Sequence, residues 1–250
     1  MYRTFALIML ATVALQAHAK VDSAQAARLN TDLTPLGAER AGNAEGSIPS
    51  WTGGVVPPAN YREGMHHPDP YAEDTVLYQI SHEHAEQNAS LLPEGLRELL
   101  KRNPDYYLRV FPTRRSASAP QRIYDATYNN ALNAELVENG NGVTGAAAGV
   151  PFPIPQNGTE AIWNHILHYR GDQNHFINNQ AVVINGNANL IRRDRQIYYV
   201  YGREGMTPDK LDNTLLYYKY TVTAPARLSG TSLVVQDPLD QVFTTRKAWR

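Results

Sequence analysis

The last third of this sequence contains runs in which apolar and polar residues alternate, and this pattern constrains the fold most. In the run LLYYKYTV, the side chains of Leu216, Tyr218 and Tyr220 fall on one side of an extended chain, and the intervening residues fall on the other. Comparable runs continue from residue 173 to the end, parted by turn signals such as Asn185-Gly186. They predict a meander of antiparallel strands.

Helical patterns precede these strands. Capping residues and apolar spacing predict helices over residues 22–30, 93–103, about 121–134 and 159–170, the last capped by Thr159. In that last helix, Ile162, Ile166 and Tyr169 form the expected apolar stripe, with Trp163 beside them. Helices followed by strands predict an α+β fold, in which a curved antiparallel sheet packs against helices.

A long irregular segment lies between the first helix and the later ones. It begins with DLTPLGAERAGNAEGSIPSWTGG, residues 32–54, and lacks periodicity to about Tyr71. So long a span without secondary structure is typical of an ordered strap or a functional loop. Its apolar anchors favour a strap, with Trp51 buried against the sheet or a helix. The expected organisation is residues 20–71 for the first helix and strap, and 72–250 for the sheet domain. The final run, VFTTRKAWR, stops within a strand, which favours truncation there.

The first nineteen residues have the features of a secretory signal peptide. Arg3 precedes an apolar run that is too short to span a bilayer, and Ala17-His18-Ala19 is a small-x-small cleavage site. Cleavage after Ala19 would leave Lys20 as the first residue. The chain has no cysteine, so an exported protein of this size fits the Gram-negative periplasm better than a disulfide-dependent secreted class.

The charge balance argues against nucleic acid as a partner. Without residues 1–19, which contain Arg3 alone among the charged residues, Lys and Arg number 23 − 1 = 22 against 24 Asp and Glu, a net charge of −2. The basic pairs Arg114-Arg115 and Arg192-Arg193 are short, and solvated strand ends are the simplest interpretation.

No pattern in the sequence predicts catalysis or a metal centre. His82 and His84 are spaced i,i+2, so their side chains diverge on a helix, unlike those of the H-E-x-x-H zinc motif. His165 and His168 are interpreted as solvated helix residues. A nucleophile elbow is missing, and the glycine-rich GNGVTGAAAG leads into proline-rich chain rather than a helix. We therefore predict no enzyme activity, catalytic residue, metal or cofactor.

The tyrosines of the predicted sheet are the best candidates for a binding site. A curved sheet lined by tyrosine and aliphatic residues, covered by an amphipathic helix, suits an apolar ligand. The alternative is that these rings only form the sheet–helix core and its solvent face. The hypothetical cavity is assigned to Trp163, Ile166, Tyr199, Tyr218 and Tyr220.

Five blocks resemble the bacterial family called domain of unknown function 1329. They are the stretch from Asp32 to Gly54, FPTRRSA, YDAT, GVPFPIPQNGTEAIWNHILHYRG and DQVFTTRKAWR. The resemblance implies a periplasmic protein of the Gram-negative envelope, with a half-barrel sheet like that of outer-membrane lipoprotein-sorting proteins. It also implies association with inner-membrane exporters or outer-membrane β-barrel proteins, and it transfers no catalytic residue.

Two functions from different classes remain open on these observations. The first is a periplasmic carrier or chaperone-like protein for lipids or other hydrophobic ligands, working with an exporter or an outer-membrane protein. The alternative is a structural or adaptor protein of the envelope without a ligand of its own, for which the long strap would supply an interaction surface. An envelope hydrolase is the third alternative and needs an acid–base pair in a cleft.

Overall fold

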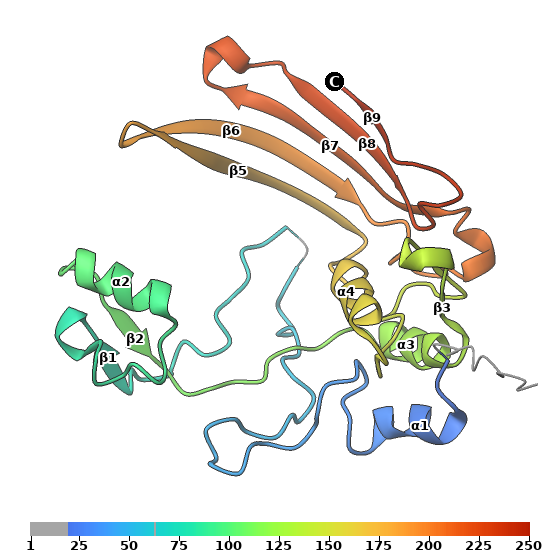
Figure 1. The fold of residues 1–250 in the computed structure, drawn as a ribbon, viewed down its shortest axis with the longest axis horizontal. Coiled ribbons are helices and arrows are strands. Elements are labelled where there is room, and N and C mark those ends of the chain that lie inside the picture. The colour runs from blue at the N-terminus through green and yellow to red at the C-terminus, as the bar shows by residue number, and fades with distance from the viewer. Residues whose placement is uncertain (1–19, 63) are drawn as a thin grey trace, which may run out of the picture. The chain divides into compact units, whose positions relative to one another are not determined.

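The computed structural model describes residues 20–62 and 64–250, so the predicted signal peptide lies outside the described residues. The chain forms two compact units. Unit 1 contains residues up to Ala38 together with 119–250, and unit 2 contains residues 39–118. The division between the units therefore falls within the strap, after Ala38. The boundary expected from the sequence lay after residue 71, where periodic patterns begin. Figure 1 shows the elements of each unit.

Unit 1 combines short helices with a five-stranded sheet. Its α-helices are α1 (Ser23–Ala27), α3 (Gln121–Asn133) and α4 (Gly158–Ile166). A small strand pair is formed by β3 (Glu135–Leu136) and β4 (Val143–Thr144). The large sheet contains β5 (Gln173–Ile184), β6 (Asn187–Tyr198), β7 (Thr214–Ala224), β8 (Ser232–Pro238) and β9 (Lys247–Trp249). Short 3₁₀ helices cover Arg28–Asn30, Glu138–Gly140, Pro208–Lys210 and Ala226–Leu228.

The large sheet is an antiparallel meander in the order β5-β6-β7-β8-β9. Strands β5 and β6 form a long hairpin around Asn185-Gly186, where both residues have positive φ, as a tight hairpin turn requires. The sheet does not close on itself, because the edge strands β5 and β9 do not pair with each other. The α+β class and the antiparallel meander predicted from the sequence are confirmed.

The two faces of this sheet differ in exposure. Residues that alternate along each strand and pair across the register are half-buried or buried on one side, apart from the exposed Phe176, whereas their neighbours are largely exposed. We call the more shielded side the inner face. Its residues are Asn174, Phe176 and Asn178 of β5, Arg193, Arg195 and Ile197 of β6, Leu216, Tyr218, Tyr220 and Val222 of β7, and Leu233, Val235 and Asp237 of β8.

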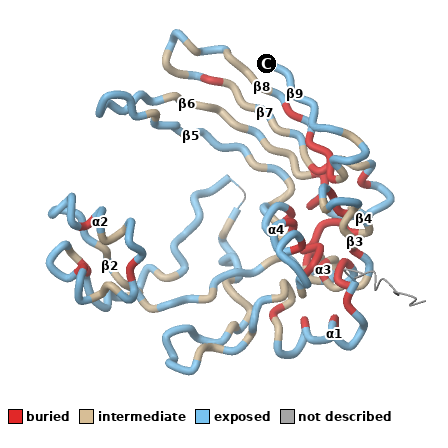
Figure 2. The backbone as a smooth tube through the Cα atoms, viewed as in Figure 1, coloured by how far each residue is buried: buried red, intermediate tan, exposed pale blue. Residues whose placement is uncertain are grey.

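The larger of the two hydrophobic clusters described in unit 1 lies at one end of the sheet, and the smaller one joins Val21, Ala26 and Leu29 to Ala131 of α3. In the larger cluster, Trp163 and Leu167 from the α4 region pack with residues after β6 and at the start of β7, among them Tyr201 and Leu215. Figure 2 shows buried residues gathered around α3, α4 and β3, whereas β5 and β6 are exposed or intermediate along most of their length. The sheet is thus anchored at its base and sparsely covered beyond it.

The structure corrects the prediction for the helix at residues 159–170. Asn157, not Thr159, is the N-cap, because its Oδ1 accepts a hydrogen bond from the backbone N–H of Glu160 at 3.0 Å. The helix ends at Ile166. Its buried face carries Glu160 and Trp163, while Ile162 is 60% exposed and Ile166 is 40% exposed. The expected apolar stripe was wrong because the Glu160 carboxylate accepts hydrogen bonds from the Asn157 side chain and from the backbone N–H of Gln156. These bonds allow the helix face that carries Glu160 to be buried.

Unit 2 has a small core and a strap held by polar contacts. Strands β1 (Tyr78–Ile80) and β2 (Leu108–Val110) pair antiparallel, and their core includes Leu100 from α2 (Glu94–Arg102). A 3₁₀ helix covers His82–His84. The Arg115 guanidinium donates to the carbonyls of Glu39, Arg40 and Ala41 at 2.6–3.2 Å. These bonds satisfy strap backbone groups that no secondary structure would satisfy.

Two expectations about unit 2 were wrong. Arg114 and Arg115 are not merely solvated, since Arg114 pairs with Asp74 and Arg115 holds the strap. The Arg114 guanidinium lowers the pKa of the Asp74 carboxyl. Trp51 is half-buried rather than packed against the sheet or a helix. Its Nε1 donates to the carbonyl of Ala117 at 2.8 Å, so the indole contacts an extended segment instead.

Gly37 gives a test of how tightly the strap of unit 1 is fitted. Its φ is +93°, and an added Cβ would lie 1.9 Å from the carbonyl oxygen of Pro153. Gly205 also has positive φ, +70°, but no atom within 4 Å of such a Cβ. We expect Gly37→Ala to lower the free energy of unfolding of unit 1 by at least about 2 kcal/mol, and Gly205→Ala by about 1 kcal/mol.

The measurement is urea unfolding followed by fluorescence of the buried Trp163, in a background carrying Trp51→Phe and Trp249→Phe. Equal losses for the two alanine variants would show that the approach of Gly37 to Pro153 contributes nothing beyond backbone strain.

Candidate functional site

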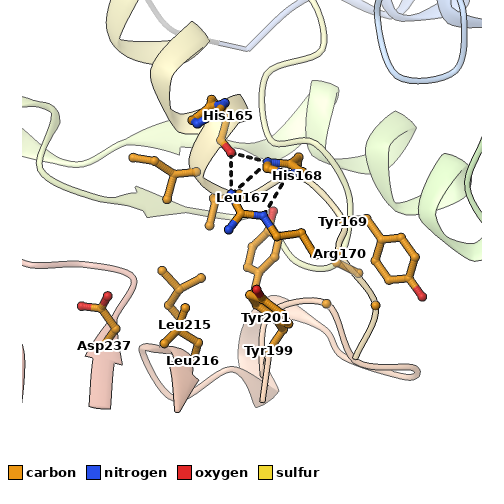
Figure 3. Close-up of a pocket in the computed structure, with 14 residues that line it drawn as sticks. His165, Leu167, His168, Tyr169, Arg170, Tyr199, Tyr201, Leu215, Leu216 and Asp237 are labelled. Atoms are coloured by element: carbon orange, nitrogen blue, oxygen red, sulfur yellow. Dashed lines mark hydrogen bonds between the residues drawn. The ribbon is translucent and has the colours of Figure 1, made fainter. Parts of the chain in front are cut away.

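A cavity of about 250 Å³ opens at the base of the sheet in unit 1. It lies between the end of α4 with the segment that follows it, the turn after β6, and the first residues of β7 (Figure 3). Leu167, Tyr201 and Leu215 form the buried part of its wall. Leu216 and Asp237 belong to the inner face of the sheet, so the cavity is continuous with that face.

One side of the cavity is polar. Arg170 donates from Nε to Nε2 of His168 at 2.8 Å, and Nδ1 of His168 contacts the carbonyl of His165 (Figure 3). In the contact with Arg170, Nε2 of His168 is the acceptor, because an arginine N–H can only donate. The group forms a hydrogen-bonded rim on one side of the cavity.

The two buried polar groups of the wall already have partners. Asp237 accepts two hydrogen bonds from the Arg246 guanidinium, at 2.9 and 2.7 Å, and this carboxylate raises the pKa of Arg246. The Tyr201 hydroxyl donates to the carbonyl of Gly149 at 2.8 Å. Burial raises the pKa of Tyr201 well above its usual range, so its hydroxyl stays protonated. Both groups are structural in this arrangement.

Arg122 of α3 holds two of the cavity's segments together. Its guanidinium donates to the carbonyl of Gly202 at 2.8 Å and to Asp172 Oδ1 at 2.7 Å, and it lies over the ring of Tyr169. The segment after α4 and the turn after β6 are therefore tied to the same helix. These contacts of Arg122 position the cavity mouth. The periodicity of the sequence did not predict them.

Beyond the cavity, the inner face carries aromatic rings paired with arginines. Arg195 Nε donates to the hydroxyl of Tyr218 at 2.9 Å, and its guanidinium lies 4.8 Å from the ring centroid of Phe176. The Arg193 guanidinium lies 4.9 Å from the ring centroid of Tyr220. Arg193 is thus a mid-strand, half-buried residue, and its interpretation as part of a solvated strand end was wrong.

The structure brings some of the five predicted site residues together. Ile166 and Tyr199 line the cavity. Tyr218 and Tyr220 lie on the inner face beyond it, among the residues paired across β6 to β8. Trp163 is 5% exposed, donates from Nε1 to the carbonyl of Gly140, and borders a second hollow on the other side of α4. Sequence reasoning did not single out Arg193 and Arg195, although their i,i+2 spacing places them on one face of a strand beside a tyrosine-rich strand.

The described residues offer no acid–base constellation in this cavity. His168 is engaged with Arg170, and Asp237 with Arg246. Within residues 20–62 and 64–250, no group of three or more His, Asp or Glu side chains is arranged to hold a metal ion. In the same part of the chain, no helix combines the length and the apolar character that a membrane span needs.

Together, these features define an α+β protein with an open antiparallel sheet and a small, partly apolar cavity at the sheet's base. Residues 79–250 match the model of the family described as "Protein of unknown function (DUF1329)". An uncharacterized protein of Pseudomonas aeruginosa is 40% identical over 246 residues, covering 97% of this chain and 54% of the relative. The chain belongs to this family, and it spans about half the length of that curated relative. No solved structure matches it.

A substitution of Tyr201 tests whether the hydrogen bond from its buried hydroxyl stabilises the cavity wall. Tyr201→Phe would leave the Gly149 carbonyl without this donor, so we expect a loss of about 1–2 kcal/mol in the free energy of unfolding. Tyr199→Phe is the matched control, because the Tyr199 hydroxyl makes no hydrogen bond to the described residues. The readout is urea unfolding followed by Trp163 fluorescence. Similar stabilities for both variants would contradict the assignment.

Proposed function

We propose that this protein is a periplasmic carrier or chaperone-like protein for lipids or other hydrophobic ligands. The observation that carries the proposal is the continuity between the cavity and the inner face of the sheet. Leu216 and Asp237 belong to both, and Ile197, Tyr218 and Val235 continue the surface along the strands. A long apolar ligand would find an anchor at the base and a shielded surface beyond it.

The size of the cavity favours a ligand that is only partly enclosed. Ligand pockets typically measure roughly 300–1,000 Å³, whereas this cavity measures about 250 Å³. One end of an acyl chain would enter it, and the remainder would lie against Tyr218 and Tyr220. Each buried methylene contributes about 0.8 kcal/mol, so affinity would rise with chain length without sharp selectivity.

The sheet bends along its strands in Figure 1. We interpret this curvature as the half-barrel of a lipoprotein-carrier-like protein, in which helices and sheet enclose an acyl chain. Working with an inner-membrane exporter or an outer-membrane protein is part of the same proposal, because a carrier in the periplasm needs a donor and an acceptor for its ligand.

Gly202 offers a way to fill the cavity without disturbing the backbone. An added Cβ would meet its nearest neighbours, the Gly171 carbonyl oxygen and Tyr169 Cδ2, at 3.7 Å, an ordinary contact distance. We expect Gly202→Met to weaken binding of 11-(dansylamino)undecanoic acid by about tenfold or more. Excluding two methylenes costs about 1.6 kcal/mol, which corresponds to slightly more than that factor.

The matched control is Gln196→Met, which adds the same side chain at an exposed position on the opposite face of β6. Dansyl fluorescence titration gives the dissociation constants. Unchanged affinity in Gly202→Met would remove the cavity from the proposed binding site. Native mass spectrometry of the purified wild-type chain should show copurified amphiphile. If it shows none and the probe does not bind, the carrier proposal is wrong, and the adaptor alternative becomes the better interpretation.

Periplasmic localisation has an independent test. Expression of the whole sequence in a Gram-negative host should give a mature protein that begins at Lys20, because Ala17-His18-Ala19 is the expected cleavage site. Cell fractionation with N-terminal sequencing is the measurement. An uncleaved protein in the cytoplasmic fraction would contradict export.

A further inference from the structure

We propose that Arg193 and Arg195 bind the phosphate group of a phospholipid-type ligand whose acyl chain lies along the inner face toward the cavity. This inference rests on the proposed carrier function and adds a ligand class to it. The two arginines occupy alternate positions of β6 and project from the same side of the sheet. Their Cα atoms are therefore about 7 Å apart, at about 3.3 Å per residue.

Aromatic rings hold both guanidinium groups in place. Arg193 lies over Tyr220, and Arg195 lies over Tyr218 and Phe176, with centroid distances of 4.8–5.2 Å. The one hydrogen bond that either guanidinium makes within the described chain runs from Arg195 Nε to the Tyr218 hydroxyl, so most of their N–H donors have no protein acceptor. The arrangement thus orients two donor forks in advance of any ligand.

The positive charge of the pair is not neutralised within the described part of the chain. Neither arginine has a carboxylate within ion-pair distance there. The nearest acid in sequence, Asp194, belongs to the opposite face and contacts His175 at 2.9 Å. Asp237, the carboxylate of the inner face, is engaged by Arg246. An anion is therefore the complementary partner for this region.

Two buried polar atoms of one cross-strand residue pair also lack partners. Arg193 Nε and Asn178 Oδ1 are inaccessible to solvent and make no hydrogen bond to the described residues. Arg193 and Asn178 are direct partners across β5 and β6. Buried polar atoms are normally satisfied, so two orphans in one cross-strand pair mark a place where the protein alone is incomplete. Rotation of the Asn178 amide would add N–H donors to the same site.

The spacing of the donors favours a phosphate over a carboxylate. A planar carboxylate matches the fork of one guanidinium, whereas a phosphate has oxygens directed to several sides and accepts from two forks at once. From Arg195 to the cavity residue Tyr199 is four residues, or about 13 Å along β6. The surface between them includes Ile197, Tyr218 and Val235, which suits an acyl chain.

The experiment compares two ligands that differ only in the phosphate. Lysophosphatidic acid and monoacylglycerol, each with the same nitrobenzoxadiazole-labelled acyl chain, are titrated below their micellar concentrations against the whole chain. The wild type is expected to bind the lysophosphatidic acid at least tenfold more tightly. The double variant Arg193→Gln/Arg195→Gln is expected to lose this preference while its affinity for monoacylglycerol changes less than twofold.

Arg192→Gln/Lys219→Gln is the matched control, since it also removes two positive charges, at exposed positions on the opposite face. It is expected to keep the preference, which excludes a general effect of net charge. Arg193→Lys/Arg195→Lys is expected to retain only part of it, because a lysine provides charge without a fork. The labelled fatty acid with the same chain should bind more weakly than lysophosphatidic acid. Equal affinities for these two acids would overturn the assignment to phosphate.

The failures of the two proposals are distinguishable. If the wild type binds both labelled lipids equally, the arginine site is wrong and the carrier proposal stands. If it binds neither, the carrier proposal itself fails. The double variant could also lose affinity for both lipids to the same extent. That result would show that the arginines only pack against the rings. Native mass spectra and circular dichroism confirm that each variant is folded.

Discussion

The structure of unit 1 depends on the loop of residues 145–150, which is hydrogen-bonded on both sides. On one side, the buried Asn130 of α3 bonds the backbone of Ala147 and Val150, and Thr127 Oγ1 accepts from the N–H of Val150. On the other, Tyr201 donates to the carbonyl of Gly149 and accepts at its own carbonyl from the N–H of Ala148. A buried loop needs such complete satisfaction of its polar groups. The same bonds fix Ala148 and Tyr201 in the cavity wall, so core and site share one support.

This anchoring divides the sheet into a rigid base and a sparsely covered remainder. Near α4, the strands meet a closely packed cluster of buried side chains. Farther along β5 and β6, the inner face is half-buried or exposed, and among the described residues of unit 1 no helix joins the hydrophobic cluster there. Antiparallel sheets tolerate one wet face, and this inner face combines Ile197, Tyr218 and Tyr220 with the two arginines of β6. The carrier proposal assigns a ligand to this mixed surface.

The sequence predicted element types well and side-chain environments less well. Alternation in β7 identified both the strand and the side that carries Tyr218 and Tyr220, because a period of two leaves little choice of face. The α4 stripe failed because Glu160 is buried by specific hydrogen bonds from Asn157 and Gln156, which no hydropathy pattern encodes. The division of the chain at residues 38 and 118 was also missed. It depends on contacts such as those of Arg115 with the strap, which join residues more than seventy positions apart.

The arginines of the inner face show where pattern analysis is weakest. A charge in an alternating strand is ordinarily assigned to the solvent side, because desolvating it without a partner is costly. Arg193 and Arg195 avoid most of that cost by lying against aromatic faces while they remain half-buried. For Arg193, stability alone is a poor explanation, since an apolar residue at that position would pack against the ring of Tyr220 without an unsatisfied donor. The proposed recognition of an anion would supply a partner for the unsatisfied Arg193 Nε and for the positive charge of both arginines.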